Sequence, residues 1–167
     1  MIRAAMFSIM ILCSLSVAQA QNVWFEPNHG QVHRSVDFLA RSGGGYVYFG
    51  RNRMAVRDVR MELVGANRKA SAEFVEPTGG ISSYFIGRTE KDWHTGIPHY
   101  ARVRYRNVYS GIDLVYYGSG RDIEYDFVLR PGADPKQIRV AYNKPVRVDE
   151  NGDLLIAGLR QRRPNVY

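Results

Sequence analysis

Two aspartates in the most strongly patterned stretch of the chain, Asp113 and Asp126, are the residues best placed to do chemistry. Residues 112–117 and 122–129 alternate in polarity with a period of two and are rich in β-branched and aromatic residues, which is typical of half-buried strands. The Gly-Ser-Gly-Arg sequence at 118–121 predicts a hairpin between them. The register that we predict for this hairpin sets Asp113 directly opposite Asp126, with Cβ atoms about 4.5 to 5.5 Å apart.

A carboxylate pair at that separation is compatible with three kinds of site. The first is a cross-strand ion-pair ladder, because Arg102, Arg104 and Arg106 alternate along the preceding strand and would compensate the aspartates. The second is a Ca²⁺ ion held by carboxylate oxygens. The third is a hydrolase dyad, since retaining glycosidases place two carboxyl groups about 5 to 5.5 Å apart. We rank the ladder first and the hydrolase last, because no second catalytic feature accompanies the pair.

The same pattern segregates the two faces of the predicted hairpin. One face is apolar and the other carries the acidic side chains. The apolar face contains Ile112, Leu114, Tyr116, Ile123, Tyr125 and Phe127, and the acidic face contains Asp113, Asp122, Glu124 and Asp126. Exposed aromatic residues suggest a stacking platform for sugars, although aromatic residues on strands more often belong to the core or its rim. We take as candidate binding residues Asp113, Asp126, Glu124, Trp93 and Tyr117.

The sequence offers no recognisable catalytic or cofactor motif. It lacks a G-x-S-x-G nucleophile motif, a P-loop and a dinucleotide fingerprint. The four histidines, His29, His33, His94 and His99, do not have the spacing of three or four zinc ligands. We therefore expect no catalytic residues, no metal site other than the Ca²⁺ alternative above, and a structural or binding role.

Many short strands separated by turns are predicted along the rest of the chain. They fall at about 36–40, 46–49, 54–64, 72–75, 83–86, 99–105, 138–142, 146–148 and 154–157. Turn compositions lie at 43–45, 77–80, 131–132 and 150–153, where the Asn-Gly pair predicts a second hairpin. The only helical signal is a single turn after Asp134. This pattern indicates an all-β antiparallel fold, either a β-sandwich or an open barrel-like module.

The first 20 residues have the features of a signal peptide. Arg3 is followed by an apolar run, and Ala18-Gln19-Ala20 is a small-residue cleavage site. We expect an exported chain that begins at Gln21, a single domain over 21–167, and no retained membrane anchor, because the apolar run is shorter than a membrane-spanning helix of about 20 residues. The formal charge of +7 falls to +6 without Arg3. The basic residues are scattered singly, so we expect no nucleic-acid partner.

Several sequence stretches resemble a bacterial secreted domain of unknown function that is found N-terminal to SBBP-type β-propeller repeats. They are F-E-P-N-H-G-Q (25–31), L-V-G-A-N (63–67), Y-F-I-G (84–87), W-H-T-G-I-P-H-Y (93–100), V-Y-S-G-I-D-L-V-Y-Y-G (108–118) and I-E-Y-D-F-V-L-R-P-G-A-D-P (123–135). The resemblance implies an all-β extracellular module with no established activity. We expect the exported chain to be extracellular, at the cell surface or periplasmic.

Three functions follow as hypotheses. The first is a non-catalytic module with a structural or interaction role at the N-terminus of a larger secreted or surface protein, with downstream repeat domains as its partner. We also expect the chain to be part of such a longer protein, because its end at Tyr167 has no polar tail. The alternative is an adhesin or glycan-binding module that recognises cell-surface glycans. A carbohydrate-active hydrolase ranks third.

Overall fold

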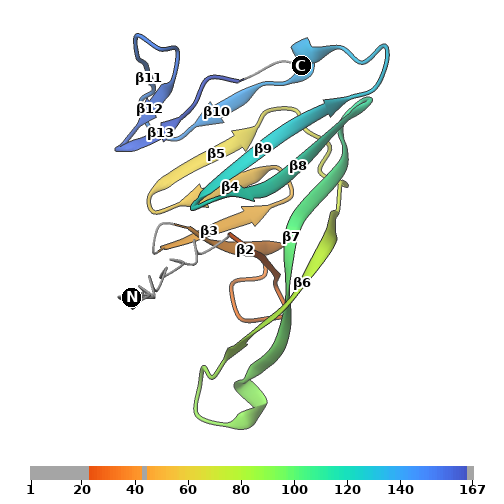
Figure 1. Ribbon diagram of the computed structural model, residues 1–167, viewed down its shortest axis with the longest axis vertical. Coiled ribbons are helices and arrows are strands. Elements are labelled where there is room, and N and C mark those ends of the chain that lie inside the picture. The colour runs from red at the N-terminus through yellow and green to blue at the C-terminus, as the bar shows by residue number, and fades with distance from the viewer. Residues whose placement is uncertain (1–22, 43–44, 165–167) are drawn as a thin grey trace, which may run out of the picture.

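The computed structural model describes residues 23–42 and 45–164. They form an antiparallel sheet that curls strongly into a half-barrel, with a second, small sheet beside it (Figure 1). The predicted all-β fold is confirmed, in its open-barrel form. The predicted signal peptide and the start of the mature chain lie outside the described residues. Within 23–42 and 45–164, no helix has the length and apolar character needed to span a membrane.

The strands and the two short 3₁₀ helices follow one another in this order. They are β1 (Phe25–Pro27), β2 (Phe38–Ser42), β3 (Gly45–Gly50), β4 (Arg53–Val56), β5 (Val59–Leu63), β6 (Ala72–Tyr84), η1 (Glu90–Asp92), β7 (His94–Tyr109), β8 (Ile112–Ser119), β9 (Asp122–Leu129), η2 (Pro135–Gln137), β10 (Val140–Tyr142), β11 (Arg147–Val148), β12 (Leu154–Ile156) and β13 (Leu159–Gln161).

The large sheet has the strand order β10-β5-β4-β3-β2-β1-β7-β8-β9, and β6 pairs with β7 outside this path. Strands β11, β12 and β13 form the small sheet. The two ends of the large sheet, β9 and β10, are connected through one residue of β13. Gln161 Nε2 donates a hydrogen bond to the Tyr125 hydroxyl of β9 at 2.8 Å, and its Oε1 accepts one from the Tyr142 hydroxyl of β10. We call this connection the seam.

The hydrophobic core lies inside the curl and is built mainly from aromatic rings. Phe38 stacks on Phe49 with ring centroids 4.4 Å apart, and Tyr116 packs edge-on against Phe49 at 4.7 Å. All three side chains are buried. The apolar face predicted for the hairpin is the face that joins this core: Leu114 and Tyr116 are buried, and the inward residues of β9 pack against it while half-buried.

The predicted register of this hairpin is wrong by two residues. The turn consists of Gly120 and Arg121 alone, so Ser119 lies opposite Asp122, Asp113 lies opposite Val128, and Asp126 lies opposite Val115. Gly120 adopts a φ of 61°, the conformation that a two-residue turn with glycine first requires. A shift of two residues leaves each side chain on its predicted face, because side chains alternate with a period of two.

Three local predictions are also corrected. Residues 54–64 form two strands, because Arg57, with a φ of 53°, makes a turn between β4 and β5. Residues 77–80 are not a turn but an irregular part of β6, where the pairing with β7 shifts between Pro77 and Ile81. The strand predicted at 99–105 is longer at both ends, because β7 begins at His94 and ends at Tyr109.

Two other local predictions are confirmed. The single helical turn after Asp134 is η2, and the Asp134 carboxylate accepts a hydrogen bond from the Lys136 N–H at 2.9 Å. The second hairpin joins β11 to β12, with Val148 opposite Leu154.

Candidate interaction site on the β6–β7 arm

A two-stranded ribbon projects from the half-barrel (Figure 1). It is formed by the end of β6 and the start of β7, and we call residues 77–100 the arm. At its root, Tyr100 pairs with both Pro77 of β6 and Phe25 of β1. Farther out, β6 is the only partner of β7 among residues 23–42 and 45–164, with Ile81 opposite Pro98 and Tyr84 opposite His94. The arm therefore holds its far end away from the rest of the sheet.

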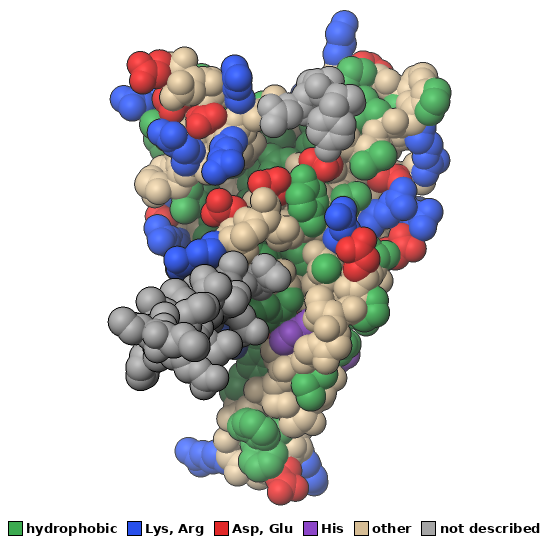
Figure 2. Space-filling view, in the orientation of Figure 1, with side chains coloured by type: hydrophobic (Ala, Val, Ile, Leu, Met, Phe, Trp, Pro, Cys, Tyr) green, Lys and Arg blue, Asp and Glu red, His purple; other side chains and the backbone are tan. Residues whose placement is uncertain are grey.

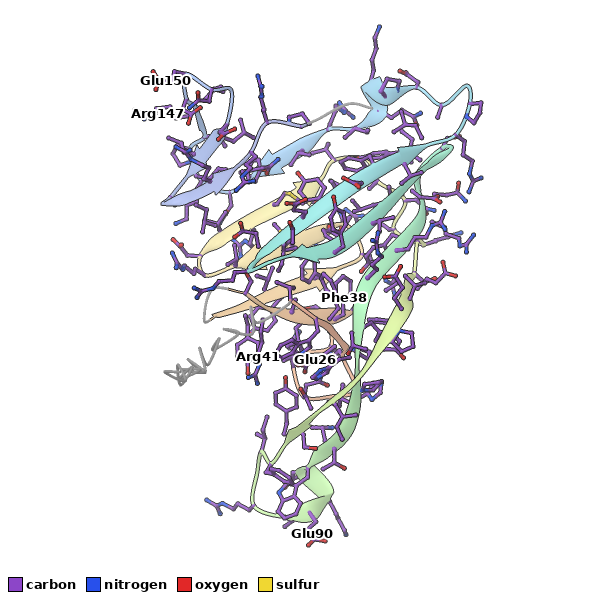
Figure 3. All side chains as sticks on the ribbon, viewed as in Figure 1. Glu26, Phe38, Arg41, Glu90, Arg147 and Glu150 are labelled. Atoms are coloured by element: carbon purple, nitrogen blue, oxygen red, sulfur yellow. The ribbon has the colours of Figure 1, made fainter. Side chains whose placement is uncertain are left out.

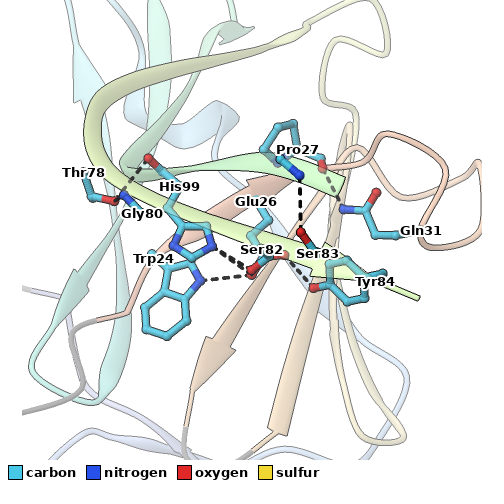
Figure 4. Close-up of polar contacts among 11 residues, drawn as sticks. Trp24, Glu26, Pro27, Gln31, Thr78, Gly80, Ser82, Ser83, Tyr84 and His99 are labelled. Carbon is cyan, nitrogen blue, oxygen red and sulfur yellow. Dashed lines mark hydrogen bonds and ion pairs between the residues drawn. The ribbon is translucent and has the colours of Figure 1, made fainter. Parts of the chain in front are cut away.

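A buried carboxylate lies at the root of the arm. The Glu26 side chain is 0% exposed and accepts three hydrogen bonds: from Trp24 Nε1 at 3.0 Å, from Ser82 Oγ at 2.9 Å and from the Tyr84 hydroxyl at 2.5 Å (Figure 4). Hydrogen bonds to a charged group are roughly twice as strong as neutral ones. Because Trp24 and Glu26 lie at β1 and the other two donors belong to β6, this cluster fixes the arm to the half-barrel.

His99 of β7 completes the cluster. Its ring stacks on Trp24 with centroids 4.9 Å apart, and its Nε2 lies 2.7 Å from Ser82 Oγ and 3.6 Å from Glu26 Oε1. Since the Ser82 hydroxyl donates to Glu26, it accepts from His99, which assigns the proton to Nε2. Burial lowers the pKa of His99, with a further lowering by Arg41, although the Glu26 carboxylate opposes this change. A side chain at Gly80 would clash with the ring, because its Cβ would lie 2.6 Å from Nδ1.

The Ser82, His99 and Glu26 side chains do not form a catalytic triad. In a triad, one imidazole nitrogen contacts the serine and the other contacts the carboxylate. Here both contacts involve Nε2, and the serine also bonds directly to the carboxylate. Two surface hollows adjoin Gly30, and none of these three residues lines either of them. Burial, followed by the bond to Glu26, raises the pKa of Tyr84, which keeps this phenol protonated. The cluster is suited to holding strands together.

The tip of the arm, residues 85–93, presents apolar side chains to solvent. The exposed fractions are 66% for Phe85, 52% for Ile86 and 40% for Trp93. The Phe85 and Trp93 rings meet edge to face, with centroids 5.1 Å apart and planes at 88°. Figure 2 shows an apolar patch at the narrow end of the molecule, with charged side chains around it. Large apolar residues exposed together on a projecting element are typical of interaction sites.

The backbone of the tip is held by its own polar contacts. The Asp92 carboxylate accepts hydrogen bonds from the Thr89 N–H at 3.3 Å and from the Thr89 hydroxyl at 3.1 Å. The Asp92 N–H returns a bond to the Thr89 carbonyl, and the Trp93 N–H bonds to the Glu90 carbonyl, which closes η1. Figure 3 shows Glu90 at the far end of the arm and Glu26 at its root. The 3₁₀ turn therefore sets Trp93 against Phe85.

Formal charges at the tip balance. Arg88 and Lys91 are opposed by Glu90 and Asp92, and all four are exposed. A balanced tip has no preference for an acidic or a basic partner, so the apolar side chains dominate what it can bind.

The candidate binding residues do not form one site. Trp93 lies at the tip of the arm, whereas Asp113, Tyr117, Glu124 and Asp126 lie on β8 and β9. The Tyr117 hydroxyl donates a hydrogen bond to Asp126 at 3.1 Å. Burial, with the Asp126 and Glu124 carboxylates, raises the pKa of Tyr117 to about 12. The structure therefore brings together Tyr117, Glu124 and Asp126 and separates them from Trp93.

The surroundings of Asp113 suit a residue that stabilises the fold. Its side chain is 2% exposed, and it accepts hydrogen bonds from Arg104 Nη2 at 2.6 Å and from the Asn107 N–H at 2.8 Å. Burial acts to raise the pKa of Asp113, but these two donors and Arg130 outweigh it and hold the pKa below its usual value. The other two arginines of the row pair with β6, Arg102 with Glu76 and Arg106 with Glu73. Within the described residues, no three or more His, Cys, Asp or Glu side chains form a group that could hold a metal ion.

The buried cluster at the root was not found from the sequence. Ser82 and Tyr84 in β6 and His99 in β7 follow Glu26 in β1 by 56, 58 and 73 residues. The sequence did contain a sign of this cluster, because Glu26, Tyr84 and His99 each belong to one of the stretches that carry the family resemblance. An acidic residue between Phe25 and Pro27 in a strand was a further sign of a buried, satisfied carboxylate.

Residues 25–167 match the family model of a domain of unknown function (DUF7948). None of the curated proteins and none of the solved structures compared with the chain matches it.

Proposed function

The chain belongs to the domain-of-unknown-function family DUF7948, and we propose that it is a non-catalytic module whose arm docks against a neighbouring domain of the same, larger exported protein. The observation that carries the proposal is the tip of the arm, where Phe85, Ile86 and Trp93 are exposed together on a rigidly anchored ribbon. Downstream repeat domains, which the sequence resemblance implies, are the partner that we propose.

The size of the patch favours a tethered partner. Complete burial of one large apolar side chain contributes about 1.5 to 3 kcal/mol, so three of them supply about 5 to 9 kcal/mol at most. Association of two free proteins costs about 4 to 15 kcal/mol in lost translational and rotational freedom, which would leave little net affinity. A partner on the same polypeptide has an effective concentration of about 1 mM or more, and a small patch is then sufficient.

The arrangement of polar groups supports a role without catalysis. Ser82 and His99, the hydroxyl and imidazole with the most suggestive chemistry, bond to each other and to the buried Glu26. Asp113 and Asp126, which would serve a glycosidase, do not face each other across β8 and β9. These groups stabilise the fold and are not arranged for catalysis, whereas the exposed tip is suited to binding.

Recognition of cell-surface glycans is the second proposal. It is supported by the exposed indole of Trp93, on which a sugar ring could stack. The Phe85 ring stands edge-on to it, at 88°, so the two rings do not make a continuous flat platform. We therefore rank glycan binding below protein docking.

The docking proposal is tested by site-specific photo-crosslinking in the native host, with a photoreactive amino acid at position 85. The matched control position is Val148, which is 63% exposed, close to the 66% of Phe85, and lies on β11. We expect position 85 to crosslink to another segment of its own polypeptide, and the Trp93→Ala variant to reduce this product. Equal crosslinking from positions 85 and 148 would refute the proposal. Binding of the purified protein to a glycan array, abolished by Trp93→Ala, would favour the second proposal instead.

A further inference from the structure

In the part of the chain that the structure describes, one edge of β9 carries no paired strand, and this edge is a second surface with a recognisable chemistry, separate from the arm. Strand β9 ends the large sheet, and among the described residues it pairs with β8 alone. An edge strand presents backbone N–H and C=O groups that can pair with an added strand. Gln161 reaches β9 through the Tyr125 hydroxyl, which belongs to the inward row of side chains.

The two rows of side chains on β9 differ in character. The inward row, Ile123, Tyr125 and Phe127, packs against the core but is only half-buried. The outward row contains Asp122, Glu124 and Asp126. An added strand would cover more of the apolar row and would place its own alternate side chains beside the acidic row.

The outer face of the sheet shows which charge belongs beside β9. Ion pairs join its neighbouring strands: Glu73 and Glu76 on β6 pair with Arg106 and Arg102 on β7, and Arg104 on β7 pairs with Asp113 on β8. Opposite charges on neighbouring strands are favourable, and like charges directly opposite are unfavourable. The outward row of β9 is acidic, so basic side chains on an added strand would make favourable pairs with it, and acidic ones would add repulsion.

The acidic row also argues against a second copy as the occupant. Two β9 strands paired edge to edge would place Glu124 and Asp126 beside the same acidic residues of the other copy. We propose that the edge of β9 binds an extended segment of a partner protein in which apolar residues alternate with arginine or lysine. Such a segment is added by β-strand pairing, with backbone hydrogen bonds supplying affinity and the basic row supplying specificity.

The chain itself contains a suitable probe. Residues 100–106, Y-A-R-V-R-Y-R, have the required alternation and occupy the equivalent position beside β8. A capped peptide of this sequence is titrated into the ¹⁵N-labelled protein and followed by NMR and amide exchange. The control peptide carries glutamate in place of each arginine. We expect the arginine peptide to shift and protect the amides of β9, and the glutamate peptide to bind about tenfold more weakly.

Charge reversal on β9 provides the decisive comparison. In a Glu124→Lys/Asp126→Lys variant the preference should reverse towards the glutamate peptide, whereas Glu90→Lys, at the tip of the arm, should leave it unchanged. If the double reversal does not fold, Glu124→Gln/Asp126→Asn should still abolish the preference. The proposal would be overturned if neither peptide bound, or if the NMR shifts mapped away from β9. It would also be overturned if the variants kept the wild-type preference between the peptides, or if the protein formed a dimer through β9.

Discussion

Removal of the Glu26 carboxylate should both destabilise the protein and loosen the arm. In Glu26→Ala, the Trp24 indole, the Ser82 hydroxyl and the Tyr84 hydroxyl all lose their acceptor at a fully buried position. A hydrogen bond to a charged group contributes about 1.5 to 3 kcal/mol, which gives a gross loss of about 5 to 9 kcal/mol. Burying the carboxylate costs several kcal/mol in desolvation, and this cost disappears with the side chain. We expect a net loss of about 3 to 5 kcal/mol in the free energy of unfolding.

The Glu26→Gln variant removes the charge of the side chain but keeps its shape, so it separates the contributions of the two. The amide oxygen can still accept from Trp24 and Ser82, but its NH₂ group would face the Tyr84 hydroxyl, which must then accept instead of donate. We expect a smaller loss, of about 1 to 2 kcal/mol. Glu90→Ala is the matched control, because Glu90 is exposed at the tip, and surface substitutions usually change stability by less than about 0.5 kcal/mol.

Urea unfolding followed by tryptophan fluorescence gives these free energies, and Trp24 reports directly on the cluster. Amide exchange of the segments 77–84 and 94–100 tests the arm, and it should accelerate in Glu26→Ala before the half-barrel strands do. A loss below about 1 kcal/mol in Glu26→Ala would refute our account of the cluster. A large loss with unchanged exchange in the arm would show that the carboxylate supports the half-barrel and not the arm.

Two further predictions concern charged residues. Arg104→Ala should lower the free energy of unfolding by about 2 to 4 kcal/mol, because it removes the closest cation from the buried Asp113. Arg106→Ala should lower it only slightly, because the pair of Arg106 with Glu73 is exposed, and 1 M salt should reduce only this second effect. Equal losses for the two variants in urea unfolding would contradict this prediction. Because burial lowers the pKa of His99 below its usual 6.5, the unfolded state binds more protons as the pH falls, so the contribution of this residue is complete above pH 6.5 and is lost below it. The wild-type protein should therefore lose stability relative to His99→Gln from about pH 6.5 downwards, and parallel stability curves for the two proteins between pH 5 and 8 would contradict this.

The alternation of side chains was sufficient to predict the strands and their faces, but not how they pair. Ile123, Tyr125 and Phe127 face the core as predicted, because a residue's face depends only on its parity. The register depends on which residues make the turn, and the Gly-Ser-Gly-Arg sequence admits more than one choice. The turn lies at Gly120 and Arg121, which removes Asp126 from its predicted place opposite Asp113.

The arm was missed because bulges and turns use the same residue types. Residues 77–80 contain Pro, Thr and two glycines, a composition typical of a turn, yet they continue β6 through a change of register. Glu76 takes a φ of 60° just before it. Only the pairing with β7, which comes later in the chain, distinguishes a bulged strand from a turn at this place.

The candidate site was predicted in part. Trp93 was selected as an exposed aromatic residue and does lie at the tip, but its partner Phe85 lies at the other end of the tip, directly after β6. His99 was considered only as a metal ligand, and it instead joins Ser82 and Glu26. Contacts between residues this far apart in sequence depend on the fold of the whole sheet, which local patterns do not specify.

The seam has a consequence for the order in which the protein assembles. The two ends of the half-barrel meet through Gln161, which follows Tyr125 by 36 residues and Tyr142 by 19. During synthesis from the N-terminus, β9 and β10 leave the ribosome before the residue that connects them. The hairpins from β2 to β5 and from β7 to β9 form by short-range pairing and can be complete by then, whereas closure must await β13. The nascent chain thus passes through a stage in which its aromatic interior faces the solvent along one side, when it is most vulnerable to aggregation.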